Sequence, residues 1–455
     1  MRALIPFFIG GCILISCTNS NEIIESGPFE LRFSQDTVLF DTLFTEVKSV
    51  TKRFRVYNDD SRARSISSIR IAGGSSSPYR IALNGLEASE FNDQVILGGD
   101  SLLFLVEANI DAGDSNNPFI VEDSVIFESA EDLGGVKLLA WGQDANYLKD
   151  SIISCDEVWD SPKPYVLLGS VLVDSLCTLT IPAGASIFSA FNTSFFVQGS
   201  IAVLGEADNK VVFRNDRLDE GFRDAPGQWE GIFFLEGSGN NLIEFAEISN
   251  SRYGIWLGTP DPDTIPDLVL RNSIISNVSN TGLIAFTSDL SVENSLIHNC
   301  GEQVVANLAG GNYAYNHCTL VNYPFQFFRE EALAVFADFV ELADGSAIVE
   351  DIDVSLLNCI VDGSLQDELI FSNNGGAEFT LLTAYNLIRT TDSDLEINEN
   401  ILNSDPLFID PENGDYQIGE TSPAVDTGIQ TSVIGDLAGN ARDAMPDRGA
   451  YERIE

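Results

Sequence analysis

The strongest constraint on the fold is a six-residue pattern that returns along the middle of the chain. It first appears at residues 245–250, FAEISN, and recurs at 272–277, 294–299, 317–322 and 358–363. The closing residues lie 27, 22, 23 and 41 positions apart (277−250, 299−277, 322−299, 363−322). A period in the low twenties is typical of a solenoid.

The places within this pattern indicate strands. The fourth place is always apolar and is filled by Ile248, Ile275, Ile297, Leu320 and Val361. The second place is always small and holds Ala246, Ser273, Ser295, Cys318 and Cys359. The third place includes Glu247 and must therefore face out. Alternating inward and outward places with β-branched residues favour strands. Because each strand is too short to bury its inner face alone, successive turns should stack about 4.8 Å apart. The pattern predicts a right-handed parallel β-helix.

The sixth place predicts the corners of that β-helix. It holds Asn250, Asn277, Asn299 and Asn322, and Asn tolerates left-handed backbone while its amide can bond to the Asn above and below. Gly363 at the last corner is expected to adopt the same left-handed backbone conformation. The alternative is chance similarity among loops rich in Asn and Ser.

The first residues have the pattern of an exported, lipid-anchored protein. Arg2 precedes an apolar run from Leu4 to Ile15 that is too short to span a bilayer, and Leu14-Ile-Ser-Cys17 follows. This resembles the lipobox of bacterial lipoproteins, which implies that residues 1–17 are a signal peptide with Cys17 as the lipidated residue. Residues 18–26 would be a tether, and a core thiol is the alternative for Cys17.

Composition limits the partners. The chain of 455 residues holds 69 acidic and 24 basic side chains, a net charge of −45. Such a charge argues against nucleic acid, anionic lipid and polyanionic substrates without bridging cations. Of the seven cysteines, Cys155 and Cys177 could pair in an oxidising compartment, whereas Cys318 and Cys359 should be buried thiols. We find no CxxC pair, so zinc is not indicated.

Residues 27–148 read as short alternating strands separated by turns. The strand segments are 52–57, 66–71, 101–106 and 124–127, with a loop at 73–78. This spacing predicts an immunoglobulin-like β-sandwich. Together with 40–44 and Leu97-Gly-Gly-Asp100, it resembles Ig-like domains of cilia-associated and bacterial surface proteins, which usually serve as spacers or platforms.

The β-helix is expected over residues 149–370. Segments 179–185 and 226–232 resemble the opening coils of bacterial β-helix proteins, where Trp229 is expected in the core rather than as a sugar platform. Residues 325–350 interrupt the repeat, and 329–342 could form a helix or an irregular loop. This insertion accounts for the 41-residue gap (363−322).

Residues 371–455 are expected to hold terminal coils and a C-terminal cap. Several short motifs appear there in order: 405–408, 413–416, 422–426, Gly428, 436–442 and 446–452. They resemble the C-terminal signature of the choice-of-anchor Q type found on bacterial β-helix proteins, with Arg448 departing from an aliphatic residue. These turn-forming motifs would close the exposed end of the solenoid, with Arg442 paired to Asp447 or Glu452.

The sequence singles out no catalytic residue. A hydrolase needs two carboxylates, and 69 acidic side chains offer too many candidates to select any. A lyase needs carboxylates around Ca²⁺ and a basic side chain, and Asp261, Asp263 and Asp267 lie near Arg252 and Arg271 in sequence. Their proline-rich segment reads better as a solvated loop, so no metal site is assigned and Ca²⁺ stays the one cofactor considered.

The two histidines are weak candidates as well. His298 and His317 lie in adjacent coils at different places of the repeat, which favours turn or surface residues over joint ligands. Neither Gly-x-Ser-x-Gly nor His-Glu-x-x-His occurs. No catalytic residue is assigned.

The sequence therefore predicts an all-β protein: an Ig-like sandwich, then a right-handed parallel β-helix with a C-terminal cap. The expected location is the cell envelope, on the outer membrane, held to the membrane by the lipid on Cys17. The expected function is a non-catalytic surface scaffold that binds a polysaccharide or protein partner. A polysaccharide lyase or glycoside hydrolase on the β-helix face is the alternative, and nucleic acid is not expected as a partner.

Overall fold

The computed structural model describes residues 23–24, 31–113, 115–129, 133–160, 162–259 and 263–454. The chain divides into two compact units, Met1–Gln143 and Asp144–Glu455. Each unit is treated by itself below. No helix among the described residues is long and apolar enough to cross a membrane.

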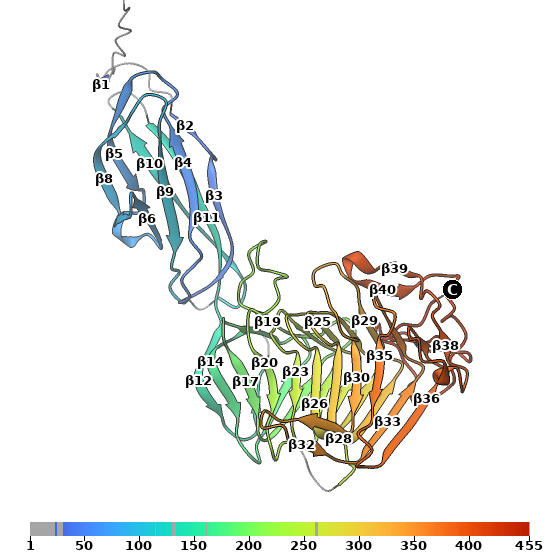
Figure 1. The fold of residues 1–455 in the computed structure, drawn as a ribbon. Helices are drawn as coiled ribbons and strands as arrows, with labels where there is room; N and C mark the ends of the chain where they lie inside the picture. Colours follow the sequence, from blue (N-terminus) through green and yellow to red (C-terminus); the bar gives the residue numbers. More distant parts are fainter. Residues whose placement is uncertain are drawn as a thin grey trace, which may run out of the picture. The chain divides into compact units, whose positions relative to one another are not determined.

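The first unit is a β-sandwich of two sheets (Figure 1). One sheet has the order β1 (Ile23–Ile24), β5 (Ala63–Ile71), β10 (Phe119–Glu128), β11 (Leu133–Gln143), β3 (Thr37–Phe44), with β8 (Glu90–Ile96) also paired to β5. The other has the order β2 (Arg32–Phe33), β4 (Lys52–Tyr57), β9 (Ser101–Ala108), β6 (Tyr79–Leu83), β7 (Leu86–Ala88). A single-turn helix, η1 (Gly74–Ser76), lies in the predicted loop.

One apolar core joins the two sheets of the sandwich. Phe54 of β4 stacks on Phe104 of β9 with ring centroids 5.0 Å apart. Phe127 of β10 meets Phe104 edge-on at 5.4 Å, so that aromatic contacts cross from one sheet to the other. Alternation in strands such as β4 produces this core because every second side chain points to the same face.

The second unit is a parallel β-helix with three faces, and the prediction of this fold is confirmed (Figure 1). Face 1 contains β17 (Ser194–Val197), β20 (Gly231–Phe234), β23 (Ile255–Leu257), β30 (Ala334–Ala337), β35 (Leu369–Ser372), the first halves of β26 (Leu283–Glu293) and β28 (Val305–Asn316), and the second halves of β12 (Asn146–Ile153) and β14 (Tyr165–Val173). Face 2 contains β13 (Glu157–Val158), β15 (Thr178–Pro182), β18 (Ser200–Leu204), β21 (Asn241–Glu244), β24 (Leu268–Arg271), β33 (Ile352–Leu357), β36 (Phe379–Ala384) and the second halves of β26 and β28.

Face 3 carries the six-residue pattern. It contains β16 (Ser186–Ser189), β19 (Val211–Asn215), β22 (Ala246–Ser249), β25 (Ile274–Val278), β27 (Leu296–Cys300), β29 (Thr319–Asn322), β34 (Ile360–Gly363), β37 (Leu387–Ile388), β38 (Ile401–Leu402) and the first halves of β12 and β14. The five fourth-place residues, from Ile248 to Val361, are fully buried in one continuous core. The five small second-place residues are buried too. Equivalent residues of the pattern therefore stack on one another in successive turns, as predicted.

The corners follow the prediction in part. Asn250, Asn277 and Asn299 have φ of 66°, 54° and 53°, and the Asn299 amide donates to the Asn277 side chain. Gly363, however, has no positive φ, so the predicted left-handed conformation is wrong for this residue. A Cβ there would lie 2.2 Å from a carboxylate oxygen of Glu368, so Gly363 is needed for space instead.

The C-terminal segment, residues 403–454, belongs to the region expected to hold terminal coils and a cap. It contains the hairpin β39 (Phe408–Asp410) and β40 (Asp415–Ile418) with η3 (Pro411–Asn413) between them. Tyr416, Leu437 and Ala450 pack on Leu296, and Ile418 packs on Ile360. These two are third-place residues, which face out from the solenoid yet are buried. The segment therefore covers the outward side of face 3.

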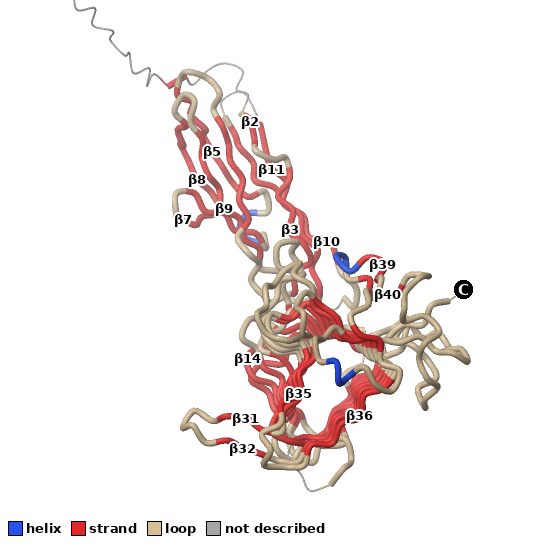
Figure 2. The backbone as a smooth tube through the Cα atoms, turned by 45° about the vertical axis from the view of Figure 1, so that its right-hand side comes forward, coloured by secondary structure: helices blue, strands red, loops and turns tan. Residues whose placement is uncertain are grey.

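The insertion of residues 325–350 is also different from the helical alternative. It contributes β30 to face 1, and then a hairpin of β31 (Phe339–Glu341) and β32 (Ala347–Val349). Figure 2 shows this hairpin projecting from the β-helix. Arg329 anchors the preceding loop by donating to both carboxylate oxygens of the buried Glu368, at 3.0 and 2.8 Å. The coil thus continues through the insertion, because β30 retains the period-2 burial of its neighbours.

Candidate binding surface on the β-helix

The outward side of face 1 carries an apolar row along the β-helix. Strand pairing aligns its members in successive turns, and we call them the outer row: Ile152, Leu172, Phe196, Phe233, Trp256, Ile284, Ala306, Val335 and Ile370. Outward places in a strand normally favour polar side chains, yet every place of this row is apolar. The row is unusual in a chain with a net charge of −45.

The centre of the outer row is aromatic and partly exposed. Ring centroids of Phe196 and Phe233 are 5.5 Å apart, and those of Phe233 and Trp256 are 6.2 Å apart. Phe286, two positions after Ile284, continues the series at 5.3 Å from Trp256. Tyr253 meets Trp256 edge-on at 5.1 Å. Each ring is held by the next, so the aromatic surface is ordered before any ligand arrives.

Polar side chains run beside the outer row, three or four positions before it (233−230, 256−252, 284−280, 306−303, 335−331). We call them the polar row, and its members are Glu230, Arg252, Asn280, Glu302, Gln303 and Glu331. They form pairs: Arg252 lies 3.6 Å from Glu230, Asn280 donates to Glu302 at 3.3 Å and Gln303 donates to Glu331 at 3.1 Å. On face 1, the apolar outer row is therefore flanked by the hydrogen-bonding groups of the polar row.

The other two faces differ from face 1. On face 2, the outward row formed by Thr180, Ala202, Leu242, Val269, Ser291, Ala314, Ser355 and Leu382 mixes polar and apolar residues. On face 3, the C-terminal segment covers the outward residues from Leu296 to Leu387. The apolar outward places of face 3 therefore have a partner within the chain, whereas the aromatic centre of face 1 stays partly exposed.

Among the described residues of the acidic loop and its neighbours, Asp263, Asp267, Arg252 and Arg271 each have other partners. Asp261 lies outside the described residues. Asp263 accepts from the Ile265 amide at 2.7 Å, and the buried Asp267 accepts from the Asp289 amide at 2.8 Å. Arg271 pairs with Glu293 at 3.2 Å on face 2, away from Arg252 at the start of face 1. Each side chain thus has a local structural task.

The two histidines were expected at turns or on the surface, and the structure places one of them at a turn but buried. His317 does occupy a corner, with φ of 53°, but is fully buried under the C-terminal segment. Its Nδ1 lies 3.1 Å from the Asp447 carbonyl oxygen and its Nε2 lies 2.9 Å from the Asn358 amide nitrogen. Burial lowers the pKa of His317 to about 3. His298 is half-buried against Tyr416, 4.8 Å between ring centroids, and burial lowers its pKa to about 4.

The cysteines occupy adjacent turns. Cys155 and Cys177 form a disulfide, and their separation of 22 residues is one turn of the β-helix. Cys318 and Cys359 are buried thiols, as predicted. Trp229 is buried as well and donates to the Ser249 carbonyl at 2.8 Å, which confirms its place in the core. Cys17 lies outside the described residues.

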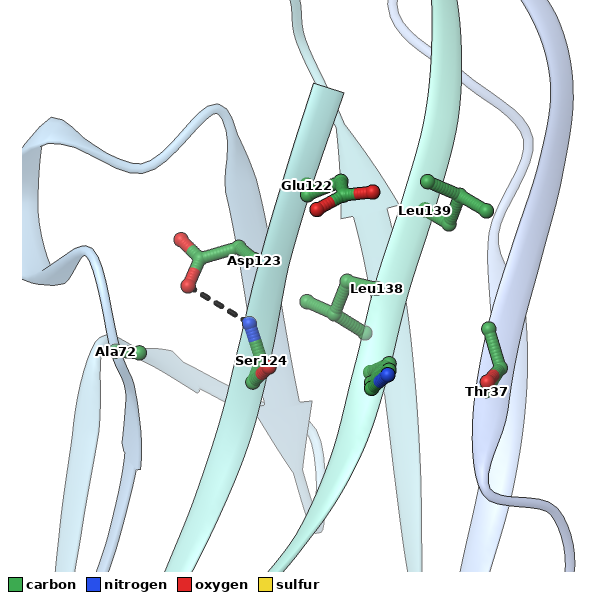
Figure 3. A pocket seen from close by; sticks show the side chains of 8 residues that line it. Thr37, Ala72, Glu122, Asp123, Ser124, Leu138 and Leu139 are labelled. Carbon is green, nitrogen blue, oxygen red and sulfur yellow. Dashed lines mark hydrogen bonds between the residues drawn. The ribbon is translucent and has the colours of Figure 1, made fainter. Parts of the chain in front are cut away.

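Cavities add no stronger candidate. One hollow of about 480 Å³ lies on the sandwich between β3, β10 and β11 (Figure 3). Its Asp123 accepts from the amides of Ser124 at 2.7 Å and Gly73 at 3.1 Å, which is a turn-capping role. Within the described ranges, no three His, Cys, Asp or Glu side chains converge to hold a metal ion.

Asp216 is one of the carboxyls whose pKa is raised by burial. Asp216 begins the loop that leads from β19 to β20, and burial raises its pKa to about 6. Asp219 lies in the same loop and is held by Arg217, with Nε to Oδ1 at 2.7 Å. The adjacent Arg214 and Asn215 each keep a buried polar atom without a hydrogen bond.

The outer row was not predicted from the sequence. The six-residue pattern describes the strands of face 3. The strands of face 1 follow loops of unequal length, so they do not recur at a constant spacing in the sequence. A signal does exist: Gly231-Ile-Phe-Phe, Gly254-Ile-Trp-Leu and Gly282-Leu-Ile-Ala share a glycine and alternate apolar places. The third residue of each is a member of the outer row.

Comparisons with known proteins assign no family. No protein-family profile matches the chain, and no curated protein matches it. A family 123 glycoside hydrolase from Clostridium perfringens aligns at 8% identity with a TM-score of 0.18, over 25% of this chain and 26% of that one. The catalytic unit of a GH87 α-1,3-glucanase from Streptomyces thermodiastaticus aligns at 11% identity with a TM-score of 0.28, over 77% and 66%. A GH87 catalytic domain with tetrasaccharides aligns at 11% with a TM-score of 0.17, over 77% and 90%. Likenesses this weak carry no argument about activity.

Proposed function

We propose that this chain is a lipid-anchored protein of the bacterial cell envelope that binds an extended neutral polysaccharide along face 1 without cleaving it. The observation that carries the proposal is the outer row, an apolar line with an aromatic centre on an acidic protein. Sugar rings have apolar faces that can stack on aromatic side chains, while their hydroxyls need hydrogen-bonding groups nearby. The outer row and the polar row supply these two requirements side by side.

The repeat of the β-helix favours a chain-like ligand. Phe196, Phe233 and Trp256 lie in consecutive turns, which stack about 4.8 Å apart. A polymer lying along the axis would therefore meet an aromatic ring at each of these three turns. The net charge of −45 favours a neutral polymer over a uronate, because like charges repel across an acidic surface.

Export and anchoring rest on the N-terminal residues and one cross-link. The lipobox-like stretch ending at Cys17 is the reason to propose an anchor. The Cys155–Cys177 disulfide supports an oxidising compartment such as the periplasm or the cell surface. Labelling with a radioactive fatty acid should tag the protein, and Cys17→Ser should abolish the tag. Equal labelling of both would remove the anchor from the proposal.

Binding is tested with purified protein on a panel of neutral and acidic polysaccharides. We expect a neutral polymer to bind, and Trp256→Ala or Phe233→Ala to weaken binding at least about tenfold, which is about 1.4 kcal/mol. Phe328→Ala is the matched control, because Phe328 is 90% exposed and lies outside the outer row. A blank panel, or equal losses in the control, would contradict the proposal.

Glycoside hydrolysis is the second candidate, and Asp216 is the observation that favours it. A general acid needs a raised pKa, and a second carboxylate must lie within reach. Asp216 has the first property, and Asp219, three positions later in the same loop, is the candidate for the second. Release of reducing ends from the same panel, abolished by Asp216→Asn, would replace the binding proposal with this one.

A further inference from the structure

The polar row continues the stacking of the strands on face 1. The backbone amide of Asn280 donates to the Arg252 carbonyl at 2.9 Å, and that of Glu302 donates to the Asn280 carbonyl at 3.0 Å. Arg252, Asn280 and Glu302 therefore lie one above another in consecutive turns, at the strand spacing of about 4.8 Å. The polar row thus runs beside the outer row and repeats with the same step.

Two amide side chains of the polar row each keep a hydrogen-bond donor for a ligand. The Asn280 nitrogen donates to Glu302 at 3.3 Å. The Gln303 nitrogen donates to Glu331 at 3.1 Å, and the Thr281 hydroxyl fixes this amide by donating to its oxygen at 3.3 Å. An amide nitrogen carries two hydrogens. The second hydrogen of Asn280 and of Gln303 has no acceptor among the residues that the structure describes.

A carboxylate lies beside each of these two donors. Glu302 and Glu331 are exposed, and a carboxylate accepts more than one hydrogen bond. An N–H donor and a carboxylate lone pair therefore reach solvent together in consecutive turns. Two neighbouring sugar hydroxyls fit such a pair, because one accepts from the N–H while the other donates to the carboxylate. The same carboxylates disfavour a sugar acid, since like charges repel.

The arrangement of hydroxyls on the sugar ring is then restricted. A pyranose whose hydroxyls are all equatorial has two apolar faces and a rim of hydroxyls. With one face over the outer row, near Phe233 and Trp256, the rim points sideways toward the polar row. An axial hydroxyl would point into the aromatic surface, where it would be buried without a hydrogen-bond partner. The geometry therefore favours all-equatorial sugars.

The straight course of the outer row restricts the linkage as well. Strand pairing keeps Phe196, Phe233 and Trp256 in register through consecutive turns. A β-1,4-linked chain of all-equatorial sugars is a straight ribbon, and each sugar advances it by nearly the strand spacing of about 4.8 Å. An α-1,4 link leaves the ring through an axial bond and bends the chain away from a straight row.

We propose that face 1 binds a β-1,4-linked polysaccharide of all-equatorial sugars, with about one sugar per turn and its hydroxyls against the polar row. The inference rests on the proposed function and specifies the ligand of that site. Phe286 continues the aromatic surface one turn beyond Trp256, with ring centroids 5.3 Å apart. The aromatic part of the site therefore covers the four consecutive turns of β17, β20, β23 and β26.

The test compares two glucose hexamers that differ in linkage alone. In calorimetric titration of the purified protein, the β-1,4-linked hexamer should have a Kd at least about tenfold lower than the α-1,4-linked hexamer. In a series of β-1,4-linked oligomers, affinity should rise up to about four sugars, because aromatic rings occupy four consecutive turns. An equal or lower Kd for the α-linked hexamer would overturn the inference. So would no binding of the β-linked hexamer by a protein that binds another polymer of the panel.

An amide variant tests the polar row. Gln303→Met keeps the length of the side chain but removes both N–H groups, and it should weaken binding of the β-linked hexamer about two- to tenfold. Gln417→Met is the matched control, because Gln417 is an amide in β40, on the C-terminal segment. Equal losses in the two variants, or no loss in either, would contradict the role of the polar row and overturn the inference.

Failure of the proposed function is a separate outcome. It fails when neither hexamer nor any polymer of the panel binds. It stands, and only the inference falls, when the α-linked hexamer is preferred and Trp256→Ala abolishes its binding.

Discussion

His317 occupies a corner of the repeat where other turns have Asn or Phe, and its burial has a measurable consequence. Its Nε2 faces the Asn358 amide, so the neutral ring fits and an imidazolium would need a second acceptor. The side chain of Asp447 is turned to other partners, the amides of Asp426 and Arg453. Arg442, bonded to the same Asp447 carbonyl, adds positive charge nearby. The folded pKa of about 3 is therefore below the ordinary value of 6.5.

The sign of the resulting pH effect is definite. The unfolded chain binds a proton on His317 below pH 6.5, while the folded chain does not until about pH 3. Stability from neutral His317 is thus present above pH 6.5 and is lost as pH falls, by about 1.4 kcal/mol per pH unit within this window. We expect wild type to lose thermal stability relative to His317→Gln between pH 7 and 4. Parallel melting curves for the two would contradict this.

Asp447 should act in the opposite direction. Burial raises its pKa to about 6 from 3.8, so the folded protein binds the proton first as pH falls. Wild type should therefore gain stability relative to Asp447→Asn as pH falls from 6 to 4, measured by the same melts. Each variant must be compared with wild type separately. The pH dependences of stability that His317 and Asp447 contribute have opposite signs and partly cancel in the wild-type curve.

Arg442 decides how the C-terminal segment is held. Its guanidinium donates to the Glu452 carboxylate at 3.0 Å, to the Asn294 side chain at 2.9 Å, and to the carbonyls of Gly435, Asp447 and Gly449. Of the two expected carboxylate partners, the structure selects Glu452. Arg442→Met should cost about 3–5 kcal/mol, because it leaves a buried carboxylate without its cation. Hydrogen exchange should then accelerate in residues 425–454, while the sandwich stays protected as an internal control.

At the scale of elements, the C-terminal segment acts as the missing outer layer of face 3. Arg448, the departure from the family-like motif, is buried and donates to the carbonyls of Thr427 and Asn386. It thereby links the segment to the turn before β37. Where this layer covers them, the third-place residues Ile274, Leu296 and Ile360 are apolar, unlike Glu247. The covered third place that is polar, Thr319, accepts from the Ala450 amide of the segment.

The disulfide joins the first turns of the β-helix and predicts a dependence on redox state. Replacing both Cys155 and Cys177 with Ser should lower stability by about 2–4 kcal/mol, since the closed loop spans 22 residues. Thermal unfolding with and without a reductant measures this for wild type. The double variant should be indifferent to the reductant; sensitivity in the variant would point to another bond.

For the whole molecule, the acidic surface makes ionic strength a discriminating variable. Binding of a neutral polysaccharide on face 1 should change little between low salt and 1 M salt, where the Debye length is about 3 Å. A uronate polymer should bind, if at all, only at the higher salt, because repulsion by a chain of −45 is then screened. Binding of a uronate that is strongest at low salt would contradict a neutral ligand.

The sequence by itself determined the architecture. Ile248 and its equivalents and the small second places repeat in every turn of the pattern, and Asn250, Asn277 and Asn299 share a left-handed corner. Asn322 and Gly363 do not adopt it. Strands β4 and β9 were likewise predicted from the alternation of apolar and polar residues along the sequence. Such patterns are short-range, so they can be recognised without knowing which segments meet.

Tertiary structure decided everything that depends on distant segments. His317 is buried because residues 130 positions later lie over it, and Gly363 is needed because Glu368 approaches it. The outer row exists because loops of unequal length bring Phe196, Phe233 and Trp256 into register. Local patterns specify a turn of the β-helix, but only the packing of turns and of the C-terminal segment specifies which faces remain open to a partner.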